Sequence, residues 1–258
     1  MLTIISPAKS ISFKEPAPTE KHSNPRLLSH SKQLASLLKQ YNQSQIIDLM
    51  SVSEKIATAT VAGYKDFQPP FQLGNAKQAL FAFTGDVFRH MRMLTYNDES
   101  LDFAQDSLRI LSGLYGCLRP LDLIQTYRLE MKTRLKTDRG PDLYHFWGNR
   151  ITKSINQDLQ DDSTPALINL ASREYARVID FKSINAPVIT IDFKETEDGK
   201  GRTIAIFAKW ARGMMADFII QNRITKPEEL KQFDLSDYKF SSEESNDLHW
   251  IFSRPRRK

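Results

Sequence analysis

The sequence predicts a mixed α/β (α+β) fold, in which a mixed sheet is flanked by helices and an N-terminal helical section follows the first strand. Two patterns predict this fold. Short β-like runs alternate with helix-like segments from residue 78 onward, and an isolated apolar run, LTIIS at 2–6, needs a sheet to join. With 258 residues, of which 40% are hydrophobic, the chain can bury a substantial core, so we interpret residues 1–258 as one domain.

The N-terminal section is expected to be helical between two breaks. Pro7 ends the first strand because proline has no backbone N–H, and the polar segment 14–25 is typical of a surface loop. Apolar residues at helical spacing then predict helices over 27–41, 45–50 and 54–66, and the pair Pro69 and Pro70 ends this section.

The rest of the chain alternates between the two patterns. Strands are expected at 78–83, 165–170, 186–193, 202–208 and 249–253. Helices are expected at 101–111, 147–159, 172–179, 211–223 and 227–231. The last helix has a start signal, with Thr225 as N-cap and Glu228 completing a capping box. The basic tail at 253–258 is interpreted as a solvated end.

Charge and composition restrict the function classes. A net charge of +5 favours polyanionic partners, and the segment 108–136 concentrates six basic side chains against two acidic ones. The longest apolar runs, such as 79–83, fall far short of the roughly 18 residues that a membrane-spanning helix needs, and the N-terminus lacks the basic region of a secretory signal. We therefore expect a cytoplasmic protein without membrane association. No feature specifies its oligomeric state.

The stretch LMSVSEKIA, residues 49–57, has two interpretations. In the first, Ser51 and Glu54 form a capping box that starts the next helix and requires no ligand. The second is a helix-hairpin-helix of about 45–66, in which backbone amides and a helix N-terminus bind a DNA phosphate. The apolar spacing of that motif is matched by Ile46, Leu49, Val52 and Ala57.

The second interpretation predicts phosphate contacts from Ser51, Val52, Ser53 and Lys55. Ser51 and Ser53 replace the two glycines of the usual motif. This matters because serine pays a steric cost in left-handed backbone geometry that glycine avoids.

Charged side chains inside the apolar segment 108–132 indicate a second functional region. They are Arg119, Asp122, Arg128 and Glu130. An unpaired charge in apolar surroundings is costly, so these residues are expected either to pair or to line a cleft.

Six segments together resemble the YaaA family of bacterial peroxide-stress-resistance proteins. They are SPAK at 6–9, FTGDVF at 83–88, LSGLYGCLRPLDLIQTYRLEM at 111–131, LYHFWG at 143–148, INLASREY at 168–175 and FAKWARGMMADFI at 207–219. The resemblance implies a cytoplasmic protein that protects against hydrogen peroxide, is associated with lowering free intracellular iron, and binds DNA. It also implies a helix-hairpin-helix, here at 46–57, and a positively charged cleft drawing on Lys9, Arg119, Arg128, Lys209 and Arg212.

Metal and thiol chemistry have little support in the sequence. The five histidines are scattered, and Asp142 and His145 are interpreted as a local hydrogen bond rather than a pair of metal ligands. The single Cys117 has no resolving partner for peroxidase chemistry and cannot form an iron–sulfur cluster alone. We therefore expect neither a metal nor another cofactor, and protection from peroxide would be indirect.

Two alternative functions remain open. The first is a nucleic-acid repair or modifying enzyme, similar to a glycosylase or lyase, in which Lys9 or Lys209 is a nucleophile beside Asp122 or Glu130. A separate form of this alternative is a base-excision glycosylase, which couples a helix-hairpin-helix to a Gly/Pro-rich loop and a catalytic Asp; Pro69, Pro70 and Gly74, followed by Gly85 and Asp86, occur in about that order. The second is a protein-interaction module that acts on iron uptake.

Overall fold

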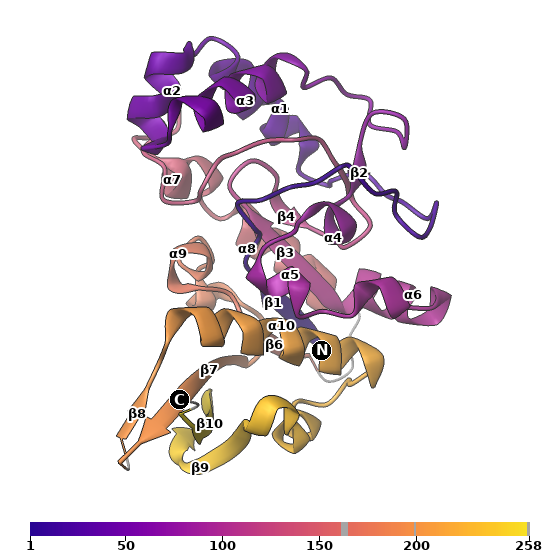
Figure 1. Cartoon of the computed structure of the whole chain (residues 1–258), viewed down its shortest axis with the longest axis vertical. Coiled ribbons are helices and arrows are strands. Elements are labelled where there is room, and N and C mark those ends of the chain that lie inside the picture. The colour runs from indigo at the N-terminus through magenta and orange to yellow at the C-terminus, as the bar shows by residue number, and fades with distance from the viewer. Residues whose placement is uncertain (161–164, 199, 257–258) are drawn as a thin grey trace.

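The computed structural model describes residues 1–160, 165–198 and 200–256, and it has the mixed α/β fold that the sequence predicts (Figure 1). Its main sheet contains eight strands among the described residues, seven of them in the order β4-β3-β1-β6-β7-β10-β9, with β8 paired to β7. The sheet is mixed because the strands from β3 to β10 in this order run parallel, while β4, β8 and β9 pair antiparallel.

Strand β1 (Leu2–Ile5) is central to the sheet and is buried along its whole length. It pairs in parallel with β3 (Leu108–Ser112) on one side and with β6 (Leu167–Asn169) on the other. The chain therefore leaves β1 towards β3, whereas it leaves β6 in the opposite direction, towards β7 (Val188–Glu197). The loops after β1 and β6 separate at this point, which leaves a crevice at the carboxyl edge of the sheet.

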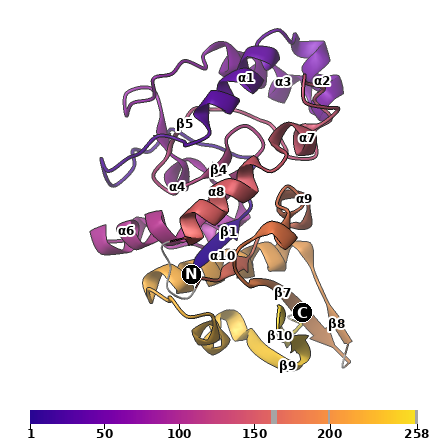
Figure 2. The same ribbon diagram turned by 180° about the vertical axis from the view of Figure 1, so that it is seen from behind.

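Helices cover both faces of the sheet. On one face α10 (Ala205–Gln221) contacts β1 and β7, and α6 (Asp98–Ser107) contacts β1 and β3. On the opposite face α8 (Arg150–Leu159) packs near β4 (Gly116–Leu118), as the reverse view shows (Figure 2). Among the described residues, every helix is too short or too polar to cross a membrane.

The N-terminal helices form a separate layer at one end of the molecule (Figure 1). They are α1 (Leu28–Leu38), α2 (Gln43–Met50) and α3 (Glu54–Lys65). The hydroxyl of Tyr64 on α3 donates a hydrogen bond of 2.9 Å to the backbone carbonyl of Arg128, which ties this layer to the central loop of the chain. Nearly all buried apolar residues of the helices and of the sheet belong to one hydrophobic cluster.

The remaining described elements are short or lie at the edges. They are the helices α4 (Ala79–Ala82), α5 (Asp86–Arg89), α7 (Leu143–Trp147) and α9 (Arg173–Ala176), the strands β2 (Lys77–Gln78), β5 (Leu123–Ile124), β8 (Lys200–Arg202), β9 (Lys239–Asn246) and β10 (His249–Pro255), and the 3₁₀ helices η1 (Met93–Thr95), η2 (Phe181–Ser183), η3 (Pro227–Gln232) and η4 (Leu235–Asp237). Strands β2 and β5 form a small sheet of their own.

Three element predictions were wrong, two of them for a shared reason. The run 78–83 folds mainly as helix α4, the run 202–208 contains the start of helix α10, and the predicted helix 101–111 becomes strand β3 from Leu108. The apolar residues of α4 and β3 are buried on every side. A run that is buried on every side shows no alternation between buried and exposed positions, so helix and strand cannot be distinguished locally.

Two predictions near the C-terminus also need correction. Lys226, not Thr225, precedes η3, and no side chain caps that helix. The basic tail is not a solvated end over its described part, because Ser253–Pro255 belong to β10 and Arg254 is buried. The Arg254 Nε donates to Glu195 Oε1 at 2.7 Å, which supplies the counter-charge that burial requires. Residues 257–258 lie outside the described part of the chain.

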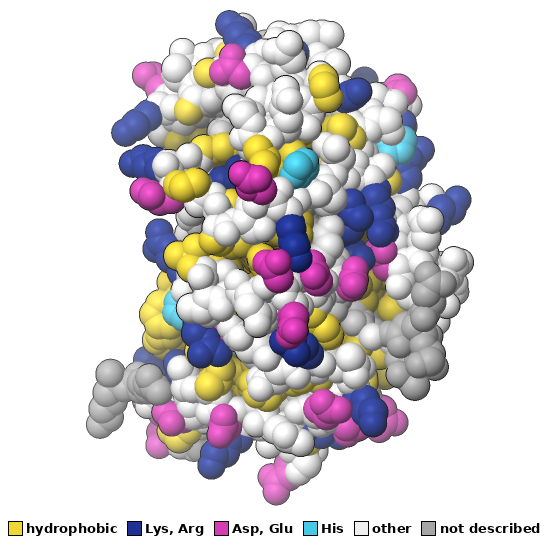
Figure 3. All heavy atoms as spheres, turned by 90° about the vertical axis from the view of Figure 1, so that its right-hand side faces the viewer, with side chains coloured by type: hydrophobic (Ala, Val, Ile, Leu, Met, Phe, Trp, Pro, Cys, Tyr) yellow, Lys and Arg dark blue, Asp and Glu magenta, His cyan; other side chains and the backbone are white. Residues whose placement is uncertain are grey.

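Acidic and basic side chains are interspersed on the side of the molecule drawn in Figure 3. Part of this mixture comes from α6, where Asp102 lies 3.0 Å from Lys21 Nζ and Glu99 pairs with Arg223 Nη2 at 2.5 Å. On this side of the molecule, therefore, the basic side chains do not form one continuous positive patch.

A glycine determines how closely α10 approaches the rest of the fold. A Cβ at Gly213 would lie 2.1 Å from the backbone carbonyl oxygen of Val87, which cannot move without shifting α5. We expect Gly213→Ala to lower the free energy of unfolding by at least about 1 kcal/mol, because this overlap exceeds the gain in helix propensity. Chemical denaturation measures the change.

Gly74→Ala is the matched control, since a Cβ there meets no atom within 4 Å. We expect this variant to change the free energy of unfolding by less than about 0.5 kcal/mol. An equal effect of the two substitutions would contradict the proposed close contact.

Candidate functional site

The turn between α2 and α3 has a left-handed residue at its first position. Ser51 adopts φ 51° and ψ 55° as the C-cap of α2, and Ser53, in extended geometry, is the N-cap of α3. The predicted capping box of Ser51 and Glu54 is wrong. The chain instead has a capping box one helix earlier, where Asn42 and Gln45 close the start of α2. Ser51 thus occupies the backbone geometry that glycine would favour.

The first turn of α3 leaves its backbone donors free. Ser53 makes no side-chain cap. Among the described residues, no acceptor lies within hydrogen-bond range of the amides of Glu54, Lys55 and Ile56. Ser51, Ser53 and Lys55 are all exposed, so solvent or a ligand reaches these donors. Free amides and the helix dipole contribute partial positive charge at this turn, which the Glu54 carboxylate in the first turn of α3 opposes.

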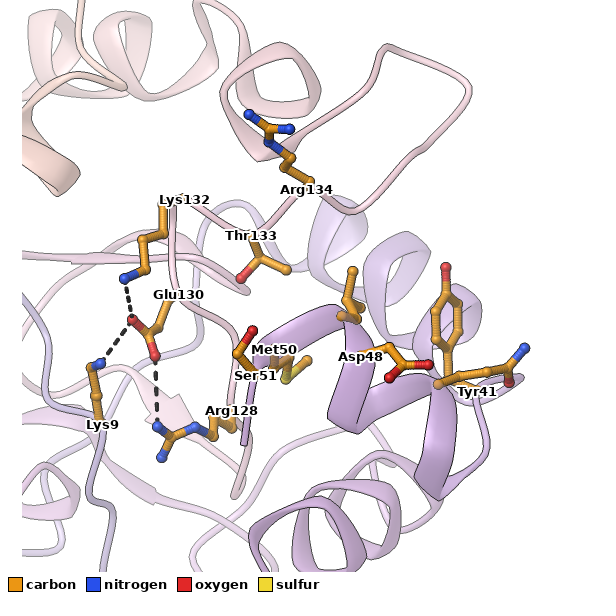
Figure 4. Close-up of a pocket in the computed structure, with 12 residues that line it drawn as sticks. Lys9, Tyr41, Asp48, Met50, Ser51, Arg128, Glu130, Lys132, Thr133 and Arg134 are labelled. Atoms are coloured by element: carbon orange, nitrogen blue, oxygen red, sulfur yellow. Dashed lines mark ion pairs between the residues drawn. The ribbon is translucent and has the colours of Figure 1, made fainter. Parts of the chain in front are cut away.

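A basic loop lies beside this turn. This basic loop is the segment between β5 and α7, residues 125–142, and it contains Glu130. The Glu130 carboxylate lies 2.9 Å from Lys9 Nζ and 3.6 Å from both Arg128 Nη2 and Lys132 Nζ. These three cations converge on one acid, as the dashed lines in Figure 4 show. The side chains of Glu130 and Arg128 are mostly buried, at 14% and 21% exposed, whereas Lys9 and Lys132 are 60% and 63% exposed. One carboxylate is therefore the shared ion-pair partner of three basic side chains.

The basic loop and α2 enclose a groove of about 760 Å³, which we call the hairpin groove. Its basic wall is formed by Lys9, Arg128, Lys132 and Arg134, and its other wall by the C-terminal half of α2 up to Ser51 (Figure 4). Two acidic residues, Asp48 and Glu130, also line it. The four basic residues exceed the acidic ones, so the groove favours an anion.

A second hollow of about 560 Å³ lies in the crevice between β1 and β6, and we call it the crevice cavity. Four of the residues proposed from sequence line it together: Lys9, Glu130, Lys209 and Arg212. Lys9 and Glu130 also line the hairpin groove, so the two hollows adjoin. The fold therefore brings together side chains that are as much as about 200 positions apart in the sequence.

Close backbone packing builds the crevice cavity. A Cβ at Gly85 would lie 2.6 Å from the Cβ of Ala8, so the loop after β1 rests directly on the segment before α5. Gly213 permits the corresponding contact between α5 and α10, which carries Lys209 and Arg212. Gly85, in FTGDVF, and Gly213, in FAKWARGMMADFI, thus allow the loop after β1, helix α5 and helix α10 to pack closely along one wall of the crevice cavity.

Arg212 is the most buried cation of the cavity. Its Nη2 donates to Asp192 Oδ1 at 3.3 Å, and its Nε is buried without an acceptor among the described residues. Burial lowers the pKa of this guanidinium, and the charge of Asp192 only partly opposes that shift. The guanidinium remains protonated at neutral pH, because the unperturbed arginine pKa is so high. Arg212 therefore brings an incompletely satisfied positive charge into the cavity wall.

Arg119 and Asp122 line neither hollow. They pair with each other instead, with Arg119 Nη2 donating to Asp122 Oδ1 at 2.9 Å. Asp122 is fully buried and also accepts hydrogen bonds from Arg119 N and Ser23 Oγ. This pair satisfies the expectation that charges in the central segment find partners, and its contacts are internal.

The thiol and histidine features behave as local structure. Burial raises the pKa of Cys117 to about 12, so the reactive thiolate is scarce at neutral pH. Asp142 caps α7 by accepting from His145 N at 3.0 Å, and its carboxylate also lies 2.7 Å from His145 Nδ1, which confirms the local interaction. Within the described residues, no cluster of three or more His, Cys, Asp or Glu side chains is arranged to hold a metal ion.

Known proteins resemble this chain over almost its whole length. A family model described as peroxide stress protein YaaA matches residues 1–244. The chain belongs to the YaaA family. A relative described as a UPF0246 protein, from Hahella chejuensis, is 43% identical over 254 residues, which cover 98% of this chain and 99% of the relative. Membership of the YaaA family gives the chain a role in the peroxide stress response.

Some residues of the hollows were missed by the sequence reasoning. Ser172 and Arg173 line the crevice cavity, and Arg134 lines the hairpin groove. Two sequence signals pointed to these residues. Ser172 and Arg173 lie within the family segment INLASREY, and Arg134 lies in the basic segment 108–136. Neither signal indicates which polar side chains of a segment face a hollow, because that depends on the ion pairs and hydrogen bonds that they form with distant parts of the chain.

The cluster around Glu130 gives a prediction for stability. Glu130→Gln removes the carboxylate that three cations share, so we expect the free energy of unfolding to fall by roughly 1–3 kcal/mol. Glu99→Gln is the control, since Glu99 is 71% exposed and its one ion pair within the described residues is with Arg223, and we expect a loss of less than about 0.5 kcal/mol. Urea denaturation of both variants makes the comparison; similar losses would exclude a special role for the cluster.

Proposed function

We propose that the chain binds duplex DNA through its phosphates, at the hairpin groove, as part of its role in the peroxide stress response. The single observation that carries the proposal is that the hairpin turn reaches a groove with four basic side chains: Ser51, three residues before the first free amide of α3, lines that groove. A duplex presents phosphates in a regular row, so one phosphate at the turn would leave its neighbours within reach of the basic wall.

The geometry of the turn supports this proposal. Small side chains at Ser51 and Ser53 let a phosphate approach the amides of α3 closely, and Lys55 adds a mobile positive charge on the same exposed surface. Amides at a helix N-terminus bind anions well, because they need no rearrangement and align with the helix dipole. On this proposal α2 and α3 act as a helix-hairpin-helix.

The wider biological role is also a proposal. By its resemblance to the YaaA family, we propose that the chain acts in the cytoplasm and that its protection involves lower free intracellular iron. Ferrous iron converts hydrogen peroxide into radicals that attack DNA, so less free iron and occupancy of DNA would protect the same target. The hairpin groove would supply the DNA-binding part of this role.

The proposal predicts DNA binding that depends steeply on salt and little on sequence. Lys55→Glu and Arg134→Glu should each weaken duplex binding by about tenfold or more at moderate salt, because each removes a cation and adds a repulsive charge. Fluorescence anisotropy with two unrelated duplexes over a series of salt concentrations measures both effects.

Lys239→Glu supplies the matched control. Lys239 is exposed on β9, at the opposite end of the molecule from α2 and α3, and the substitution changes the net charge by the same amount (Figure 1). Equal losses for all three variants would indicate only a general charge effect. Absence of duplex binding at low salt would disprove the proposal.

A second candidate function is favoured by the crevice cavity. Lys9 and Lys209 line it together with the acids Asp86 and Glu130, which is the composition expected of a nucleic-acid repair or modifying enzyme with a lysine nucleophile. Such a lysine would condense with the aldehyde of an abasic site, releasing water and forming an imine. A covalent adduct after borohydride reduction, present in the wild type and lost in Lys209→Gln or Lys9→Gln, would support this function.

A further inference from the structure

The crevice cavity lies at the point where ligands of open α/β sheets usually bind. Its floor is closed by contacts between the loops that follow β1 and β6. Ser172 N donates to Ser6 Oγ at 2.8 Å, and Ser6 Oγ donates to Ser172 Oγ at 3.2 Å. Small molecules bind at such a position because the loops diverge there and leave backbone and side-chain donors facing one space.

The cations of one wall are only partly neutralised within the described residues, because Arg212 alone has an acidic partner, Asp192. Lys209 and Arg173 make no ion pair among the described residues, and the Arg212 Nε lacks an acceptor. Arg173, Lys209 and Arg212 also line a neighbouring hollow that contains Asp192, so these three side chains lie between the crevice cavity and that second hollow. By contrast, the buried Arg109 and Arg254 each have a close acidic partner, Asp158 and Glu195, at 2.7 Å. The crevice cations thus have unused capacity for an anion.

Ser172 adds a neutral donor to these cations. Its hydroxyl oxygen accepts a hydrogen bond from the Ser6 hydroxyl. Among the described residues, the Ser172 hydroxyl itself donates no hydrogen bond. Two guanidinium groups, an ammonium group and a hydroxyl form a donor set suited to a phosphoryl group, which offers three oxygens and up to two negative charges. A carboxylate offers only two oxygens and one charge.

Asp86 adds a negative charge to the lining of the crevice cavity. This carboxylate is half-buried, lines the cavity and has no ion pair among the described residues. An ionised carboxylate accepts hydrogen bonds and repels a phosphate, so it selects a part of the ligand that carries hydroxyl or amino donors. The volume of about 560 Å³ falls in the usual range for small-molecule sites.

We propose that the crevice cavity binds a small phosphate monoester of the size of a sugar phosphate or a mononucleotide. The phosphoryl group contacts Lys209, Arg212 and Arg173, with Ser172 as a neutral donor, and a hydroxyl or amino group of the ligand donates to Asp86. This site differs from the hairpin groove in location and in ligand, although Lys9 and Glu130 lie at the boundary of both.

Isothermal titration calorimetry on the full chain tests this proposal. Ribose 5-phosphate and adenosine 5′-monophosphate are compared with ribose and adenosine, and we expect saturable binding only of the phosphorylated members. Lys209→Gln should weaken that binding by about tenfold or more, because an ammonium–phosphate contact is lost. Arg212→Gln should do the same, and Lys209 is the safer position because its side chain is exposed.

Asp86→Ala tests the orientation of the ligand. We expect it to weaken binding of ribose 5-phosphate and to leave binding of inorganic phosphate unchanged or stronger, since only the sugar donates to Asp86 and the repulsive charge is removed. Lys55→Gln, on the hairpin, is the control and should not alter binding of either compound. Thermal unfolding of each variant checks that it is folded.

Three results would overturn the proposal. In the first, the phosphorylated compounds bind no better than their dephosphorylated counterparts. In the second, their binding is unaffected by Lys209→Gln and Arg212→Gln in folded protein. In the third, only a DNA duplex with a terminal 5′-phosphate, compared with the same duplex ending in a 5′-hydroxyl, depends on Lys209, which would assign the cavity to DNA ends.

Discussion

The parallel pairing of β1 with β3 on one side and β6 on the other constrains where every other part of the molecule lies. β1 spans four residues, and all are buried. Each of its parallel neighbours has to return from a distant part of the chain. The N-terminal helices occupy the long return to β3, and the loops after β1 and β6 diverge because their strands lead in opposite directions. The crevice follows from topology before any side chain is considered.

Some charged side chains of this protein are enclosed in ion pairs within the fold, whereas others remain available to a ligand. Asp158 is held between Arg26 and Arg109; burial acts to raise its pKa, but hydrogen bonds and charges from the two guanidinium groups outweigh burial and lower it. Below that lowered pKa the carboxylate is protonated, so the stability it contributes is present at neutral pH and is lost in acid. Glu195 is similarly enclosed by Arg254 and the Tyr238 hydroxyl.

The two hollows differ from those enclosed pairs in how their charges are satisfied. In the hairpin groove three cations share Glu130, and in the crevice cavity Lys209 and Arg173 have no acidic partner among the described residues. A buried unpaired charge costs several kcal/mol, whereas one that faces a water-filled hollow retains most of its hydration. Cations therefore persist in the hollows at little cost to stability, and they remain available to an anionic ligand.

The sequence by itself determined the α/β class, the first strand, the helices on either side of the hairpin turn and the family. It did so because local periodicity, turn chemistry and long specific segments are properties of neighbouring residues. Only the tertiary structure decided that 79–82 is a helix, that 108–112 is a strand, and that Arg119 turns inward to Asp122 while Lys209 faces the crevice. Such outcomes depend on pairing and close packing between segments far apart in the chain, such as Gly213 against Val87, which no local pattern encodes.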